Sequence, residues 1–296
     1  MALEEVNSIP KLAPRAQDGH KGRYGTVLVF AGGRGMAGAA ALCGASALRS
    51  GAGLVRVATS AEAQPVVASF EPCYMTYPLP STAEGLVDFR RSRSALAGLI
   101  EKADVVAVGP GLGQSDDIRA LVRFLIDETK KPLVIDADGL NSLAGDVRIL
   151  AGRKNPTVLT PHPGEFARLT GTDVAAVQAD RVRHAAELAA MSEGLVVVLK
   201  GAGTVVTDGR RYYLNTTGNP GMASGGSGDV LTGVIAALIG QRMEAFDAAR
   251  LGVFAHGLAG DIARDDHGEV GMIAGDIVDA LPDAFAHLLP DPNLPH

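Results

Sequence analysis

Residues able to do chemistry are concentrated in one run, NTTGNPGMASGGSGDVL, which spans residues 215–231. It contains five glycines, and the apolar stretch VLTGVIAALIG continues from its end. Glycine turns that lead into a helix N-terminus present several unpaired backbone N–H groups in one direction, and the helix dipole adds positive potential. Such a loop binds anions and suits a phosphoryl group in transfer.

Asp229 lies in this run at the point where the apolar stretch begins. A carboxylate beside a bound phosphate repels it, unless the carboxylate takes a proton from the attacking nucleophile. Asp229 therefore has two interpretations: a general base, or an N-cap for the helix that follows. The spacing of the residues does not decide between them.

Apolar runs typical of buried strands alternate with stretches of helical periodicity along most of the chain. The predicted strands lie within residues 26–33, 54–59, 103–113, 131–141, 156–165 and 195–199. This alternation predicts a mainly parallel sheet with helices on both faces, and an antiparallel hairpin near 205–214. Ligands of such sheets bind beyond the carboxyl ends of the strands. The loops expected on that rim are 32–38, 109–113, 136–141, 160–165 and 200–204.

Two of these loops carry charged residues with more than one interpretation. Lys200 follows the strand LVVVL, and it could contact nucleotide phosphates or be a solvent-exposed lysine at a strand end. Asp136, Asp138 and Asn141 follow another strand, where they could order metal-bound water or cap the next helix. His256 and Asp261 fall within a predicted helix and are expected to pack beside the site.

Several motifs in order resemble one known family. GNPGMASGGSGDVLTG is similar to the signature of the NAD(P)HX dehydratases, a branch of the ribokinase-like superfamily. AGAAALCGASALRSGAGLVRVAT, VGPGLG, VIDADGLN, LTPHPGEFARLTG and KGAGTVVTDG resemble its other loops, so the resemblance covers about residues 20–285. Arg34 departs from the small polar residue expected after Gly32-Gly33.

The resemblance implies a ribokinase-like three-layer α/β sandwich with a mainly parallel central sheet. We expect one catalytic domain over residues 1–296, with a core at about 20–285, a short N-terminal extension and a mobile tail at 290–296. The implied reaction returns the S epimer of NADHX or NADPHX to NADH or NADPH. It consumes ADP, or alternatively ATP, by phosphorylating the ring hydroxyl and eliminating phosphate, with Mg²⁺ bridging the phosphates.

The resemblance also implies roles for individual residues. Catalysis falls to Asp229 as base, with Ser227 and Gly228 stabilising developing charge through backbone N–H groups. The nucleotide is expected at Lys200, Gly201, Ala202, Gly203, Thr204 and Gly228. The substrate is expected at Ala39, Gly111, Gly113, His162 and Asp229. Glu165 is expected to contact Mg²⁺ through water, although a lone loop histidine such as His162 is usually structural.

Two rival functions remain open: a kinase of a small alcohol or vitamin precursor, and a catalytically silent nucleotide sensor. A Rossmann dehydrogenase is disfavoured although residues 33–38 read GxGxxG, because the strand that follows does not end in the required acid and Glu62 comes after it. Residues 35–39 are still expected to line a dinucleotide site.

Bulk composition sets the remaining expectations. A net charge of -6 without a basic cluster disfavours nucleic-acid binding. Neither a signal-peptide core nor a long apolar run is apparent, so we expect a cytoplasmic protein without membrane association. Cys43 and Cys73 are expected to be buried. We also expect the protein to form a homo-oligomer, specifically a tetramer.

Overall fold

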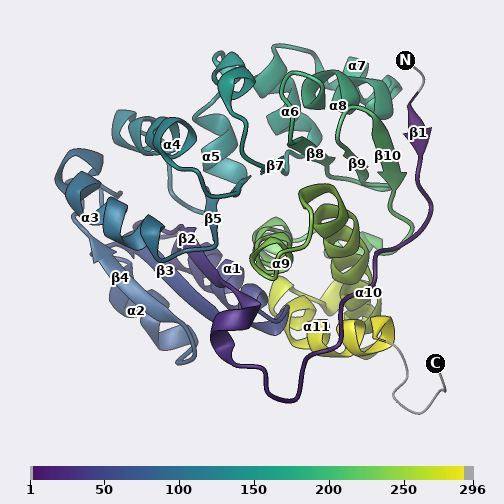
Figure 1. The fold of residues 1–296 in the computed structure, drawn as a ribbon, viewed down its shortest axis with the longest axis horizontal. Coiled ribbons are helices and arrows are strands. Elements are labelled where there is room, and N and C mark those ends of the chain that lie inside the picture. The colour runs from purple at the N-terminus through teal and green to yellow at the C-terminus, as the bar shows by residue number, and fades with distance from the viewer. Residues whose placement is uncertain (1–2, 290–296) are drawn as a thin grey trace.

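The computed structural model describes residues 3–289, which form one ten-stranded sheet between two helical layers (Figure 1). The predicted tail at 290–296 lies outside the described residues. The strands are β1 Glu4–Glu5, β2 Thr26–Phe30, β3 Leu54–Ser60, β4 Met75–Leu79, β5 Val105–Val108, β6 Leu133–Ile135, β7 Thr157–Leu159, β8 Leu195–Leu199, β9 Val205–Thr207 and β10 Arg211–Leu214.

Eleven α-helices and three short 3-10 helices connect these strands within the described residues. The α-helices are α1 Ala37–Arg49, α2 Gln64–Phe70, α3 Phe89–Glu101, α4 Asp116–Glu128, α5 Ala137–Asn141, α6 Pro163–Thr170, α7 Val174–Ala179, α8 Arg181–Ala189, α9 Ser227–Gly240, α10 Ala245–Gly271 and α11 Ala274–Leu288. The 3-10 helices are η1 Lys21–Tyr24, η2 Val147–Gly152 and η3 Pro220–Met222.

The strand order is β1-β10-β9-β8-β7-β6-β5-β2-β3-β4. The strands from β8 to β4 in this order are parallel, and β9 runs antiparallel to both of its neighbours. The predicted mainly parallel sheet and the predicted hairpin near 205–214 are therefore confirmed. The order of the strands reverses between β2 and β5. From β2 the sheet grows outward through β3 and β4, and the chain then crosses back to place β5 on the other side of β2.

Side chains of the buried strands point alternately into two separate hydrophobic cores, one on each face of the sheet. Val27 and Val29 of β2 pack with α1, α9, α10 and α11 on one face, while Leu28 and Phe30 pack with α3, α4 and α6 on the other. Burial on both faces explains why these strands are continuous apolar runs. The sheet is thereby a rigid base for the loops at its edge.

Several peripheral elements and one cysteine differ from expectation. The edge strands β1 and β4 were not predicted, since β1 has two residues and β4 contains Pro78, which cannot donate to a ladder. Cys43 is buried as expected, but the prediction for Cys73 is wrong because this thiol is exposed in the turn between α2 and β4. Among residues 3–289, no helix is long and apolar enough to cross a membrane.

Candidate active site

The predicted rim forms at the carboxyl ends of neighbouring parallel strands. Asp136 follows β6, Thr160 follows β7 and Lys200 follows β8, while the loops at 109–113 and 32–38 follow β5 and β2. The last two loops meet at the reversal of chain order, where Gly32 N donates to Pro110 O at 2.8 Å. Ligands of open α/β sheets bind at such a point.

Helix α9 begins at the glycine run and aims its N-terminus at this rim. Gly226 is its N-cap with φ +95°, a conformation that favours glycine, and a Cβ there would lie 2.5 Å from Leu42 Cδ1. Ser227, Gly228 and Asp229 form the first helical turn. Asp229 is therefore inside the helix, not at its cap, and the N-cap interpretation of this residue is wrong.

The carboxyl group of Asp229 lies in an environment that disfavours its charge. Burial raises its pKa from the usual range to about 7, and repulsion from Asp136 adds to the effect, while attraction to Lys200 opposes it. A carboxyl group with this pKa exchanges a proton near neutral pH. That property suits a general acid or base.

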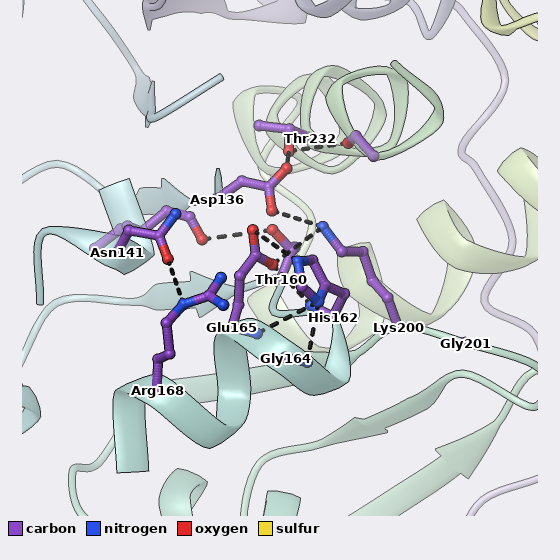
Figure 2. A network of polar contacts seen from close by, with 12 residues as sticks. Asp136, Asn141, Thr160, His162, Gly164, Glu165, Arg168, Lys200, Gly201 and Thr232 are labelled. Atoms are coloured by element: carbon purple, nitrogen blue, oxygen red, sulfur yellow. Dashed lines mark hydrogen bonds and ion pairs between the residues drawn. The ribbon is translucent and has the colours of Figure 1, made fainter. Parts of the chain in front are cut away.

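Lys200 turns its ammonium into the site and away from solvent. Its Nζ donates to Asp136 Oδ1 at 2.8 Å and lies 3.8 Å from Glu165 Oε2, with 19% of the side chain exposed (Figure 2). Burial lowers the pKa of Lys200, but the charges of Asp136 and Glu165 outweigh burial and leave the pKa raised. The interpretation of Lys200 as a solvent-exposed lysine is wrong.

Asp136 is almost fully buried, with 1% exposure, between the end of β6 and helix α9. It stands at the N-cap position of α5, yet its side chain makes no capping bond, so that interpretation is wrong. Its Oδ2 accepts instead from Thr232 Oγ1 at 2.7 Å. Asp138 Oδ2 accepts from Gly113 N at 2.8 Å, which ties two rim loops together.

His162 and Glu165 form a capping box at the start of α6. His162 Nδ1 accepts from the backbone N–H groups of Gly164 and Glu165, and Glu165 Oε2 accepts from His162 N at 2.8 Å. Because Nδ1 accepts, a neutral His162 carries its proton on Nε2. Half of the His162 side chain is exposed, so this N–H can also donate to a ligand.

The turn at residues 201–204 is an exposed backbone loop. Gly203 has φ +63° with open space around it, and Thr204 Oγ1 closes the turn by donating to Gly201 O at 2.9 Å. On the inner side of the turn, the Arg181 guanidinium donates to the carbonyl oxygens of Leu199 and Lys200. The loop is therefore supported on its inner side and open on its outer side.

Ala39 and Gly111 are brought together at the N-terminus of α1. A Cβ on Gly111 would lie 2.9 Å from Ala39 Cβ and also 2.9 Å from Met36 O, and Gly111 has φ +59°. Gly113 is close by, where a Cβ would lie 2.8 Å from Leu86 Cδ2. Both glycines thus permit a close approach of two loops.

Two grooves lie beside the glycine loops and share Gly38 at the start of α1. One of about 570 Å³ begins at Gly38 and Gly225 and follows α11, and another of about 450 Å³ runs past residues 33–38 and α2. Arg34 forms two 2.7 Å hydrogen bonds with Glu62 beside the second groove. Glu62 is thereby engaged, which further weakens the dehydrogenase interpretation.

The acidic side chains fit magnesium that keeps much of its own water. No group of three or more His, Cys, Asp or Glu side chains among residues 3–289 could hold a metal directly. Carboxylate oxygens of Asp136 and Glu165 nevertheless face Lys200, and Mg²⁺ is usually bound through one or two carboxylates together with water and phosphate oxygens.

Two buried residues of the site were not assigned a specific contact from the sequence. Thr232 is fully buried in α9 and reads there as a core residue of an apolar helix. His256 lies in α10 with its Nε2 3.5 Å from Ser227 Oγ, and burial lowers its pKa to about 4, so it is neutral at pH 7. Its predicted place beside the site agrees with this contact.

This fold and site define a ribokinase-like protein. A ribokinase-like superfamily structure from Enterococcus faecalis superposes with a TM-score of 0.78 and 26% identity over 94% of this chain. The predicted fold class is confirmed. A hydroxyethylthiazole kinase from Pyrococcus horikoshii shares the fold alone, with a TM-score of 0.61 and 18% identity.

The chain belongs to the NAD(P)H-hydrate dehydratase family, whose sequence model matches residues 27–283. The ADP-dependent (S)-NAD(P)H-hydrate dehydratase of Neisseria meningitidis is 39% identical over 90% of this chain and 86% of its own length. The ADP/ATP-dependent NAD(P)H-hydrate dehydratase of Bacillus subtilis, co-crystallized with ATP/Mg²⁺, superposes with a TM-score of 0.80 and 32% identity over 94% of this chain and 95% of its own.

Longer relatives match as well. The bifunctional NAD(P)H-hydrate repair enzyme of Moorella thermoacetica is 46% identical over 94% of this chain, and that match covers 52% of the relative. The chain therefore spans about half the length of the first curated relatives that it matches.

Proposed function

We propose that this protein dehydrates the S epimer of NADHX and NADPHX to NADH and NADPH at the expense of ADP. The observation that carries the proposal is the first turn of α9, where Asp229 has a pKa of about 7 beside the backbone N–H groups of an uncapped helix and the ammonium of Lys200. Membership of the dehydratase family supports the choice of substrate.

The chemistry follows from the leaving groups. Hydroxide leaves a ring carbon poorly, and phosphate leaves far better. Asp229 takes the proton of the ring hydroxyl, the hydroxyl oxygen forms a bond to the terminal phosphorus of ADP, and the bond from that phosphorus to AMP breaks. The phosphate ester then breaks its C–O bond, a neighbouring ring carbon loses a proton, and the reduced nicotinamide ring is restored.

The other residues of the site stabilise charge and orient the reactants. Backbone N–H groups of Ser227 and Gly228 stabilise the developing charge on the phosphoryl oxygens. Lys200 and the open turn at 201–204 bind the nucleotide phosphates. Glu165 and Asp136 would hold magnesium through water, and the ion would supply further charge neutralisation at the phosphates.

The dinucleotide substrate occupies the opposite side of the rim. Ala39, Gly111 and Gly113 approach its nicotinamide end closely, and the half-exposed Nε2–H of His162, which lies 3.5 Å from Glu165 Oε1, donates to it. The two grooves that share Gly38 provide length for the rest of a dinucleotide. An extended substrate explains a site that is longer than a small alcohol requires.

The test is turnover of the purified protein with the hydrate, Mg²⁺ and either ADP, ATP or no nucleotide. We expect the absorbance of NADH to return together with release of inorganic phosphate, and ADP to be the better donor. Absence of turnover with both nucleotides would overturn the proposed function.

A kinase of a small alcohol is the second candidate, because solved kinases share the fold. A kinase would accumulate a phosphorylated alcohol and release no inorganic phosphate in the same assay. A silent sensor would bind ADP without turnover. Family membership favours the dehydratase over both.

The remaining expectations stay predictions. They are a single catalytic domain, a homo-oligomer with the tetramer as its specific form, and a cytoplasmic location. Light scattering of the purified protein tests the oligomer.

A further inference from the structure

A chain of hydrogen bonds crosses the site from helix α9 to Lys200. Thr232 Oγ1 donates to Asp136 Oδ2 at 2.7 Å, and Asp136 Oδ1 accepts from Lys200 Nζ at 2.8 Å (Figure 2). The three residues come from α9, the end of β6 and the end of β8. Both oxygens of one buried carboxylate are thus engaged, one on each side.

The Lys200 end of this chain of hydrogen bonds lies against the first turn of α9. A Cβ added to Gly228 would lie 3.1 Å from Lys200 Nζ and 3.7 Å from Asp136 Oδ2, so the ammonium fits closely beside this backbone. A lysine side chain has about 2 kcal/mol of rotamer entropy and reaches many positions when it is free. Holding it at one position therefore requires a fixed partner.

The partner of Lys200 is Asp136, and the hydroxyl group of Thr232 holds the Asp136 carboxylate in place. Its side chain is fully buried in a helix whose other buried residues are nearly all apolar, where a hydroxyl group is unfavourable unless it is hydrogen-bonded. The carbonyl oxygen of Gly228 lies 3.2 Å from the same hydroxyl, so the shorter contact to Asp136 takes the proton. The hydroxyl therefore orients the Asp136 carboxylate.

We propose that Thr232 and Asp136 are positioning residues that hold the Lys200 ammonium against Gly228, where it contacts the phosphoryl group in transfer. This inference rests on the proposed function of the site, in which Lys200 binds the nucleotide phosphates. Thr232 acts without touching a substrate, through two successive hydrogen bonds.

The first experiment compares Thr232→Val with Thr232→Ser. Valine has nearly the shape of threonine but cannot donate, whereas serine keeps the hydroxyl. A hydrogen bond to a charged group contributes enough for Thr232→Val to lower kcat by about 10- to 100-fold, with little change in KM for the hydrate. Thr232→Ser should restore most of kcat. Equal loss in both variants at equal melting temperature would overturn the inference.

The second experiment places Thr232→Val in a Lys200→Met background and measures ADP affinity with Mg²⁺ by calorimetry. If Thr232 acts through Lys200, the valine change lowers ADP affinity in the wild type but by less than about twofold in the Lys200→Met protein. An equal loss in both backgrounds would show that Thr232 only packs the helix. Because binding is measured without turnover, this result stands even when a missing dehydratase activity overturns the proposed function.

Discussion

Two cations, Arg153 that is buried and Lys200 that is largely buried, lie at opposite ends of the same parallel sheet and are held in opposite ways. Arg153 lies where β6 and β7 begin, and its guanidinium donates to neutral oxygens: the carbonyls of Ile126, Thr129 and Lys131 and the hydroxyl of Thr157. Lys200 lies where the strands end and contacts carboxylates.

The difference appears in the charge balance of the two ends. Burial lowers the pKa of Arg153 to about 10, because neutral carbonyls do not compensate its charge in full. Around Lys200, carboxylates exceed ammonium groups, and burial together with repulsion from these carboxylates raises the pKa of Asp229 to about 7. The Arg153 end has its hydrogen-bond partners within the protein, whereas the excess negative charge at the Lys200 end is stabilised when a proton or a cation binds. This contrast separates a structural cation from one in a reactive site.

The largest expected effect is on turnover at the carboxyl end. Asp229→Asn removes the proposed base, so turnover should fall by about 10²- to 10⁴-fold. The amide is nearly isosteric and neutral, so melting temperature and ADP affinity should persist or rise. Paired assays of turnover, calorimetric affinity and melting check this. Full activity in the variant would show that Asp229 is not the base.

The second effect is on stability at the other end. Arg153→Met leaves four oxygen atoms without their donor, which should lower the free energy of unfolding by about 3 kcal/mol. Because Arg153 lies far from the rim, kcat should not change at a temperature where the variant is folded. Denaturant titration and steady-state kinetics measure the two quantities, and a large loss of kcat would contradict the separation of the two ends.

The third effect is a pH dependence of the rate. A base must be ionised to accept a proton, so kcat/KM should rise with pH and level off above about pH 7, the pKa of Asp229. Below that value the rate should fall about tenfold for each pH unit. A profile measured across this range is the test, with melting curves at each pH as control. A rate that is flat between pH 5 and 8 (roughly one unit or more on either side of the pKa) would contradict the assignment.

The smallest effect concerns the space beside Lys200. Gly228→Ala places a methyl group 3.1 Å from Nζ, so the ammonium must shift by a few tenths of an ångström. Since a 1 Å misplacement costs about 10²-fold, this shift should slow turnover by roughly 3- to 5-fold. Alanine also favours a helix by up to about 1 kcal/mol, so the variant should be slower and more stable. A variant that is less stable would indicate a backbone clash.

The sheet and its rim were predictable because their signals are local. Strands such as β2 and β8 are apolar on both faces, and the glycine loops follow them directly. The contact of Thr232 with Asp136 was not predictable, because the two residues are 96 positions apart and strand order alone brings them together. Nothing in the periodicity of α9 separates this threonine from a core residue.

Only the three-dimensional structure could decide between the alternative interpretations of Asp229 and of Lys200. Asp229 lies three positions beyond the N-cap Gly226, a difference within the error of a predicted helix boundary, which is about two to four residues. The direction of the lysine side chain depends on a carboxylate 64 positions away.

The two-residue strand β1 has a consequence at the outer edge of the sheet. It pairs with β10 through Glu4 and Glu5, and Arg250 Nη1 donates to Ser8 O just beyond it. An open edge strand is a template on which other chains add strands and aggregate. A two-residue strand offers little backbone for such pairing, and its exposed acidic side chains disfavour it further. This edge of the sheet is therefore a poor template for aggregation, a property separate from the chemistry at the rim.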